Sequence, residues 1–126
     1  MVRDELLSEM IENFGIGIDI SSIERFRKKP FSENESFYKK IFSDEEINYC
    51  LKFKNSSEKF AGKFAIKEAV LKSINKNIDI SQIITSYSKS KPTVTILNFD
   101  QNYRFLASVS HENDLAIAMV VAEKTK

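Results

Sequence analysis

The sequence is poor in the residues that form disulfides and zinc sites, with one cysteine, Cys50, and one histidine, His111, in 126 residues. A lone thiol cannot close an intramolecular disulfide, and a chain without a Cys/His cluster lacks the motifs of zinc and iron–sulfur sites. These absences favour a reducing compartment. We therefore expect a cytoplasmic location.

Long apolar runs and an excess of one charge are missing as well. No apolar run approaches the roughly 20 residues that span a bilayer, and the N-terminus lacks the basic-then-apolar layout of a signal peptide. The 19 basic and 18 acidic residues leave a formal net charge of +1. We therefore expect no membrane segment, and the overall charge is not that of a nucleic-acid-binding protein.

The length suits one compact domain, because 126 residues, 42% of them hydrophobic, can bury a core of their own. We expect a single domain over residues 1–126, with residues 1–13 as an N-terminal extension. Apolar residues at helical spacing in this extension favour an amphipathic helix. The alternative is a short appendage, or a translation start at Met10.

A strand is predicted over residues 15–20, where three isoleucines alternate with two glycines and Asp19. Since the side chains of a strand point alternately to its two faces, the isoleucines share one face, and Asp19 shares the other with the glycines. Because glycine has no side chain, we expect it to leave space beside the carboxylate.

Helix signals follow this strand. A short helix is predicted over residues 23–29, ended by Pro30, and a capping-box pattern at Ser43 and Glu46 opens another. The longest helical pattern covers residues 57 to about 76 and carries apolar residues around most of its circumference. This pattern predicts a central helix that is buried on several sides.

In the second half of the chain the pattern changes to that of strands, rich in β-branched and aromatic residues. Four strands are predicted, over residues 82–87, 93–99, 104–110 and 115–122, and the last two flank a hairpin-like turn. With the first strand, they predict an α+β fold in which an antiparallel sheet packs against the long central helix.

Two carboxylates, Asp19 of the first strand and Glu68 of the long helix, stand in apolar surroundings. Burying an ionised carboxylate is costly unless it is paired, hydrogen-bonded or bound to a cation. Carboxylate oxygens suit Mg²⁺, which also retains water and substrate phosphate oxygens. The two acids therefore suggest a shared magnesium site for a phosphate-bearing substrate. The alternative is that each acid caps or pairs with a nearby lysine.

Five short sequence motifs, taken in order, are similar to those of one family. They are Gly15-Ile-Gly-Ile-Asp-Ile20, Ile23-Glu-Arg-Phe26, Lys40-Ile-Phe-Ser-Asp-Glu-Glu46, Ala61-Gly-Lys-Phe-Ala-Ile-Lys-Glu-Ala-Val-Leu-Lys72 and Ser108-Val-Ser-His-Glu112. From about Phe14 to Glu123 the chain resembles the holo-acyl carrier protein synthases, the short bacterial type of 4'-phosphopantetheinyl transferase.

The resemblance implies an enzyme that transfers 4'-phosphopantetheine from coenzyme A to a serine of apo-acyl carrier protein, for fatty-acid biosynthesis. Asp19 and Glu68 match the family's ligands for Mg²⁺, with Mn²⁺ as the alternative ion. Lys72, one helical turn after Glu68, can reach the same phosphate. Our hypothesis is that Glu68 takes the serine proton, directly or through a metal-bound water, while Mg²⁺ and Lys72 stabilise the transferring and leaving groups. The alternatives are that Glu68 is a ligand only and that Lys72 is a solvated helix lysine.

The resemblance also implies a set of coenzyme A contacts: Lys63, Lys91, Pro92 and His111. By itself a single histidine is more often structural, but His111 matches the family's Ser-x-Ser-His word. The chain departs from the family at three places. Lys63 stands where arginine is common, Ser90 replaces a glycine, and residues 75–77 replace a glycine-rich turn. We therefore expect nucleotide binding to differ in detail.

Basic residues crowd the short helix after Asp19, namely Arg25, Arg27 and Lys28. Such a run is usually a solvated face, but in a nearly neutral chain it also forms a local positive patch that can steer an acidic partner. Acyl carrier proteins are small and acidic, and the resemblance maps the family's carrier-contacting arginine onto Arg25. We expect this helix to dock the carrier protein.

Short-type members of the family form trimers with sites between subunits, so the resemblance implies a homotrimer. Three other functions stay open: transfer to a polyketide or nonribosomal-peptide carrier domain, a non-catalytic module that binds coenzyme A or a carrier, and an α+β interaction domain with a basic docking helix. The joint presence of Asp19, Glu68 and Lys72 argues against the non-catalytic module.

Overall fold

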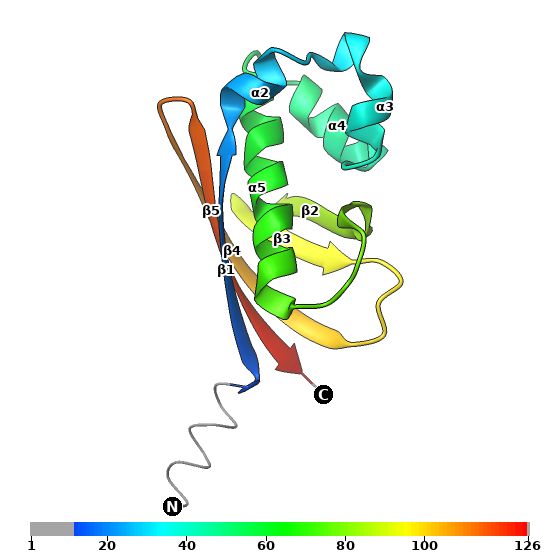
Figure 1. The fold of residues 1–126 in the computed structure, drawn as a ribbon, viewed down its shortest axis with the longest axis vertical. Coiled ribbons are helices and arrows are strands. Elements are labelled where there is room, and N and C mark those ends of the chain that lie inside the picture. The colour runs from blue at the N-terminus through cyan, green and yellow to red at the C-terminus, as the bar shows by residue number, and fades with distance from the viewer. Residues whose placement is uncertain (1–11, 126) are drawn as a thin grey trace, which may run out of the picture.

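The computed structural model describes residues 12–125, in which one long helix lies across an antiparallel sheet (Figure 1). The sheet has the strand order β1-β5-β4, and β2 and β3 form a separate antiparallel hairpin. The strands are β1 (Phe14–Ser22), β2 (Ile83–Ser88), β3 (Lys91–Ile96), β4 (Asn102–Glu112) and β5 (Leu115–Thr125). The helices are α2 (Ile23–Arg27), α3 (Glu35–Lys39), α4 (Asp44–Leu51) and α5 (Ser56–Ile74), with short 3₁₀ turns η1 (Phe31–Glu33) and η2 (Ile80–Gln82).

The predicted α+β class, with a long central helix on an antiparallel sheet, is confirmed. The strand pattern does not say which strands pair, and here the second half of the chain contributes to two sheets instead of one. Within the described residues no helix is long and apolar enough to cross a membrane. The single domain stays a prediction, and most of the predicted extension, residues 1–11, lies outside the described residues.

The backbone of β1 touches the backbone of α5 at two glycines. A methyl group at Gly15 would lie 1.7 Å from the carbonyl oxygen of Ser73, and one at Gly17 would lie 1.8 Å from that of Ala69. Two residues of strand and four residues of helix advance by a similar length, about 6–7 Å, so successive inward positions of β1 meet successive turns of α5. The glycines thus make room for the helix backbone, and not for the carboxylate of Asp19 as we expected.

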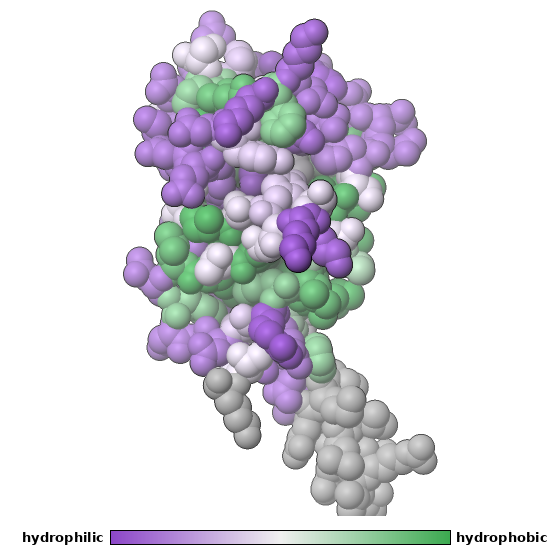
Figure 2. All heavy atoms as spheres, turned by 180° about the vertical axis from the view of Figure 1, so that it is seen from behind, coloured by the Kyte–Doolittle hydropathy of each residue, from purple (hydrophilic) through white to green (hydrophobic). Residues whose placement is uncertain are grey.

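The other face of β1 is exposed and apolar. Ile16, Ile18 and Ile20 are 67%, 57% and 61% exposed, which confirms that the isoleucines point away from the acid. Leu106 of β4 and Met119 of β5 continue this outer face, at 74% and 47% exposed. Seen from behind, apolar residues gather across the middle of the molecule, between more hydrophilic ends (Figure 2). So large an exposed apolar surface indicates an interaction site.

The core has two parts. One lies under the short helices and is rich in aromatic rings, and the other lies between α5 and the sheets. The first part of the core includes Phe26, Tyr38, Phe42 and Phe60, and the second Ala65, Ile66, Ala69, Val70, Ile83 and Val120.

The predicted capping box at the start of α4 is confirmed, because both of its hydrogen bonds, between Ser43 and Glu46, are present.

Replacing Gly17 with alanine should destabilise the fold by about 3 kcal/mol or more, because the new methyl group meets backbone that cannot move without separating β1 from α5. Urea denaturation measures this change in the free energy of unfolding. Gly62→Ala is the matched control, since a methyl group there lies 3.2 Å from the His111 ring, a side chain that can shift. Equal stability of the Gly17→Ala variant and the parent would contradict the backbone contact.

Candidate functional site

Asp19 lies two residues beyond Gly17 on the same face of β1, beside α5. Its side chain is 15% exposed, and its Oδ1 atom lies 3.2 Å from Nζ of Lys72. The same ammonium donates a hydrogen bond to the carbonyl oxygen of Ile18 at 3.0 Å. Lys72 is itself 55% exposed, so one end of this pair opens to solvent.

Glu68 lies on this flank of α5, within electrostatic reach of Asp19. Burial raises the pKa of the Glu68 carboxyl, and the negative charge of Asp19 raises that pKa further. The charges of Lys72 and Arg25 act in the opposite direction. The two acids that we expected to share a cation are therefore close enough to repel each other. We call this group the acid flank: Asp19, Glu68, Lys72 and Arg25.

The acid flank suits a hard divalent cation. It offers carboxylate oxygens from Asp19 and Glu68, and a positive ion between them would relieve their repulsion. No group of three or more metal-binding side chains occurs among residues 12–125. The remaining positions would be filled by water and substrate oxygens, which is the arrangement that Mg²⁺ prefers. The residues present therefore fit the predicted ion.

Arg25 belongs to the acid flank by its position. Its guanidinium lies 4.7 Å from the centre of the ring of Phe64, a residue one helical turn before Glu68 on α5. The same guanidinium donates a hydrogen bond to Oγ of Ser21 at 3.4 Å. The two other predicted docking residues lie further out. Arg27 is paired with Glu24 at 3.1 Å and Asp114 at 2.8 Å, bridging α2 to the turn after β4, and Lys28 is exposed.

Lys63 faces a different flank of α5 from Glu68. Five helical positions separate the two residues, which corresponds to a rotation of about 140°. Lys63 is only 2% exposed and donates to the carbonyl oxygen and to Oγ1 of Thr85, at 3.2 and 2.9 Å. Its ammonium lies 4.9 and 5.1 Å from the ring centres of Tyr49 and Tyr87. Lys63 and both rings line a pocket of about 240 Å³ between α4 and β2.

A second pocket, of about 440 Å³, contains the predicted nucleotide contacts Lys91 and Pro92. Residues 105–109 of β4 form its other wall, including Ser108 of the family word. Tyr87 lines both pockets, so the two are neighbours. We call the two pockets with Lys63 the basic flank.

Two of the departures from the family keep the backbone geometry that glycine favours. Ser90 has φ of 68°, and Asn75, at the end of α5, has φ of 50°. Both angles lie in the left-handed region, which costs a residue with a side chain about 1 kcal/mol more than glycine. The chain therefore places a side chain at two backbone positions that favour glycine.

His111 lies at the end of β4 against the first turns of α5. Its Nε2 atom is 3.3 Å from the carbonyl oxygen of Glu58, and its Nδ1 atom is 3.9 Å from the carboxylate of the same residue. The side chain is 26% exposed. His111 lines neither of the two pockets of the basic flank, so the structure does not bring it together with Lys91 and Pro92.

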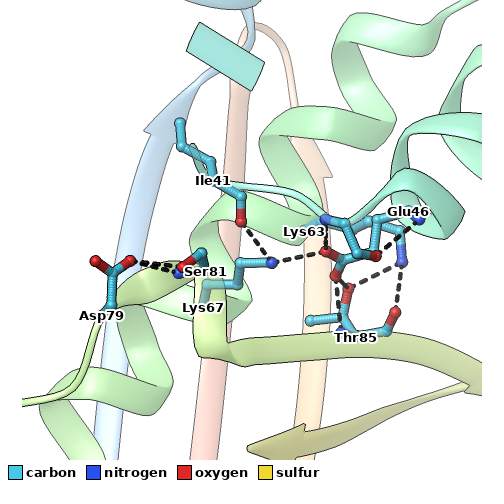
Figure 3. A network of polar contacts seen from close by, with 8 residues as sticks. Ile41, Glu46, Lys63, Lys67, Asp79, Ser81 and Thr85 are labelled. Atoms are coloured by element: carbon cyan, nitrogen blue, oxygen red, sulfur yellow. Dashed lines mark hydrogen bonds and ion pairs between the residues drawn. The ribbon is translucent and has the colours of Figure 1, made fainter. Parts of the chain in front are cut away.

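Sequence reasoning missed a buried polar network beside Lys63 (Figure 3). Nζ of Lys67 lies 2.7 Å from Oε1 of Glu46, and both side chains are at most 1% exposed. Oε2 of Glu46 accepts a hydrogen bond from the hydroxyl of Thr85 at 2.6 Å. Glu46 was recognised only as a helix-capping residue. The available signal was the pair of lysines, 63 and 67, one turn apart among the mostly apolar residues in the middle of α5.

Comparison with known proteins agrees with this geometry. A family model described as the 4'-phosphopantetheinyl transferase superfamily matches residues 15–120. The holo-[acyl-carrier-protein] synthase of Thermodesulfovibrio yellowstonii is 36% identical over 115 residues, covering 89% of this chain and 98% of its own. That of Clostridium kluyveri is 38% identical over 125 residues, covering 90% and 92%.

Solved structures of the same kind superpose on the chain. The Helicobacter pylori holo-[acyl-carrier-protein] synthase in complex with coenzyme A has a TM-score of 0.72 and 36% identity, covering 86% of this chain and 99% of that one. The Bacillus anthracis synthase, in complex with coenzyme A (3',5'-ADP), has a TM-score of 0.72 and 28% identity, covering 88% and 96%. The resemblance first indicated by five sequence words is thus confirmed over most of the chain, which belongs to the 4'-phosphopantetheinyl transferase superfamily and, within it, to the holo-[acyl-carrier-protein] synthases.

Proposed function

We propose that this enzyme transfers 4'-phosphopantetheine from coenzyme A to a serine of apo-acyl carrier protein, in a Mg²⁺-dependent reaction that serves fatty-acid biosynthesis. The observation that carries the proposal is the mutual electrostatic action of Asp19 and Glu68, with the Lys72 ammonium on Asp19, in a chain whose relatives are synthases of this kind. We also propose a cytoplasmic location, which the buried free thiol of Cys50 suits.

Each residue of the acid flank has a proposed role. Asp19 and Glu68 would hold the divalent ion, Mg²⁺ or alternatively Mn²⁺, which when bound neutralises charge on phosphate oxygens. In the proposed reaction Glu68 accepts the proton of the attacking serine hydroxyl, directly or through a water. Lys72 lies beside Asp19, where its ammonium stabilises negative charge on the leaving phosphate.

Protonation of the Glu68 carboxyl also determines how metal binding depends on pH. Glu68 must be deprotonated to act as a ligand or as a base, and its pKa is raised, so the protonated form persists to a higher pH than for an ordinary glutamate. Apparent metal affinity is therefore expected to weaken as the pH falls through this raised value.

One assay tests the proposed function. The protein is incubated with coenzyme A, Mg²⁺ and apo-acyl carrier protein, and mass spectrometry follows the added arm on serine. Transfer should stop with a chelator, drop about 100-fold or more in Glu68→Gln, and drop at least about tenfold in Lys72→Ala. Glu12→Gln, an exchange of the same kind at an exposed position before β1, is the control for the charge removal. Parent-rate transfer by both Glu68→Gln and Lys72→Ala would refute the assignment.

Carrier docking is proposed for the basic residues of α2, Arg25 and Arg27, and for Lys28, which caps its C-terminal end. Arg25 acts on Glu68 and Arg27 holds Asp114, so changing either residue also alters other contacts. Lys28 is exposed and gives the cleaner test.

Lys28→Glu should raise the KM for the acidic carrier about tenfold and leave the KM for coenzyme A within about twofold, because charge at a docking rim acts mainly on association. The control is Lys124→Glu, the same charge reversal at the far end of β5. Steady-state kinetics with each substrate varied in turn measures both constants. An equal rise in both constants would argue against docking here.

A homotrimer with sites between subunits is proposed from two features. The acid flank and the basic flank lie on different sides of α5, so one coenzyme A molecule reaches both more readily if they come from neighbouring copies. The exposed outer face of β1, β5 and β4 supplies an apolar surface for such contacts.

Ile18→Lys, which places a charge in the centre of this face, should shift the molar mass measured by light scattering from trimer to monomer and abolish transfer. Leu97→Lys is the control, because Leu97 is 49% exposed but lies after β3, outside the three-stranded sheet. As a second readout, inactive Glu68→Gln and Lys63→Met chains should regain transfer when dissociated and reassembled together. Failure of this complementation, with assembly intact, would show that each site belongs to one chain.

A further inference from the structure

The buried carboxylate of Glu46 organises the basic flank (Figure 3). Its Oε1 atom accepts hydrogen bonds from Nζ of Lys67 at 2.7 Å and from the backbone N–H of Ser43 at 2.9 Å. Its Oε2 atom accepts from the backbone N–H and the hydroxyl of Thr85, at 2.8 and 2.6 Å. Both oxygens are therefore fully used, and three separate parts of the chain are tied to one side chain.

These contacts determine the direction of the Thr85 hydroxyl. An ionised carboxylate only accepts, so the single hydroxyl proton of Thr85 points to Glu46. The lone pairs of the same oxygen are then free to accept from Nζ of Lys63, which lies 2.9 Å away. Glu46 thus fixes Thr85 as an acceptor, and Thr85 in turn holds Lys63.

The charge of Lys63 is only partly balanced by its neighbours. Lys67 forms a direct ion pair with Glu46, whereas Lys63 contacts neutral groups: the oxygens of Thr85 and the faces of two tyrosine rings. An ammonium has three protons, and two of them go to Thr85. No hydrogen-bond acceptor for the third occurs among residues 12–125, and Lys63 lines the 240 Å³ pocket. A buried cation with a spare proton beside a pocket is suited to an anion.

We propose that Thr85, oriented by Glu46, is a positioning residue that holds the Lys63 ammonium toward its pocket, where it binds a phosphate group of coenzyme A. The inference rests on the proposed function. It concerns binding and not the chemical step, because Thr85 lies on the basic flank, away from Glu68 and Asp19.

Two substitutions separate the hydroxyl from the shape of the side chain. Thr85→Val keeps the volume and removes the hydroxyl, and Thr85→Ser keeps the hydroxyl and removes a methyl group. Because Glu46 retains the backbone N–H of Thr85, its carboxylate stays hydrogen-bonded in both variants. Thr95→Val, at an exposed position of the neighbouring strand β3, controls for the change from threonine to valine in a strand.

Thr85→Val should weaken coenzyme A binding about tenfold, the size typical of a lost hydrogen bond to a charged group. Titration calorimetry measures this affinity directly, and kcat should stay within about twofold of the parent value. Thr85→Ser, which keeps the hydroxyl, should bind coenzyme A with the affinity of the parent. If packing alone matters, the serine variant, which leaves a cavity, will bind worse than the valine variant, and the proposal is overturned.

A double-mutant cycle tests whether Thr85 acts through Lys63. In a Lys63→Met background, Thr85→Val should cause no further loss of coenzyme A affinity, whereas independent effects would multiply. Multiplying losses would overturn the proposal even if each variant binds weakly. Urea denaturation of each variant confirms that the folded state is being compared.

The same measurements distinguish this inference from the proposed function. A parent protein that transfers phosphopantetheine while Thr85→Val binds coenzyme A normally would refute the positioning role and leave the function intact. A parent protein that neither binds coenzyme A nor modifies the carrier would refute the function itself.

Discussion

Contact between the backbones of β1 and α5 is the constraint on which the rest of the molecule depends. Gly15 and Gly17 let the strand lie directly against the helix, and a side chain at either position would collide with a carbonyl oxygen of α5. Because strand and helix advance at matching lengths, this contact also sets their register. The register brings Asp19 within electrostatic reach of Glu68 and within 3.2 Å of the Lys72 ammonium. A folding requirement and the geometry of the acid pair therefore have the same cause.

The helix separates two kinds of electrostatic surroundings. On the acid flank the like charges of Asp19 and Glu68 repel each other, and a solvent-exposed lysine partly compensates them. With Arg25 included, the acid flank carries two negative and two positive groups, so neither sign is in excess there. On the other flank buried Lys67 pairs directly with Glu46, and buried Lys63 is linked to the same carboxylate through the hydroxyl of Thr85. Both oxygens of that carboxylate are hydrogen-bonded. In the proposed function the two acids hold a divalent ion and Lys63 contacts a phosphate group directly, so one helix would carry residues for both tasks.

The site could be predicted where local pattern and chemistry coincide. Asp19 and Glu68 stood out because acids are rare in apolar surroundings. The motifs that contain them also resemble those of a known family. Lys63 was predicted as a coenzyme A contact, but nothing in its spacing said that its ammonium would be buried on Thr85. Glu46 was interpreted correctly as a helix cap, and its second role stayed hidden because Thr85 lies 39 positions away. The two pockets had no sequence signature, since distant elements form their walls.

The sequence by itself determined most of the periodic features: the five strands, three of the four described helices, the apolar face of β1 and the α+β class, whereas the short helix α3 was not predicted. These follow from local conformational preference and from the alternation of apolar residues, both of which act over a few neighbouring positions. Only the tertiary structure decided how the strands divide into two sheets, that the glycines serve the helix backbone, and that Lys63 is buried against Thr85. Such features arise from contacts between segments far apart in the chain, where close packing and the need to pair every buried charge select one arrangement.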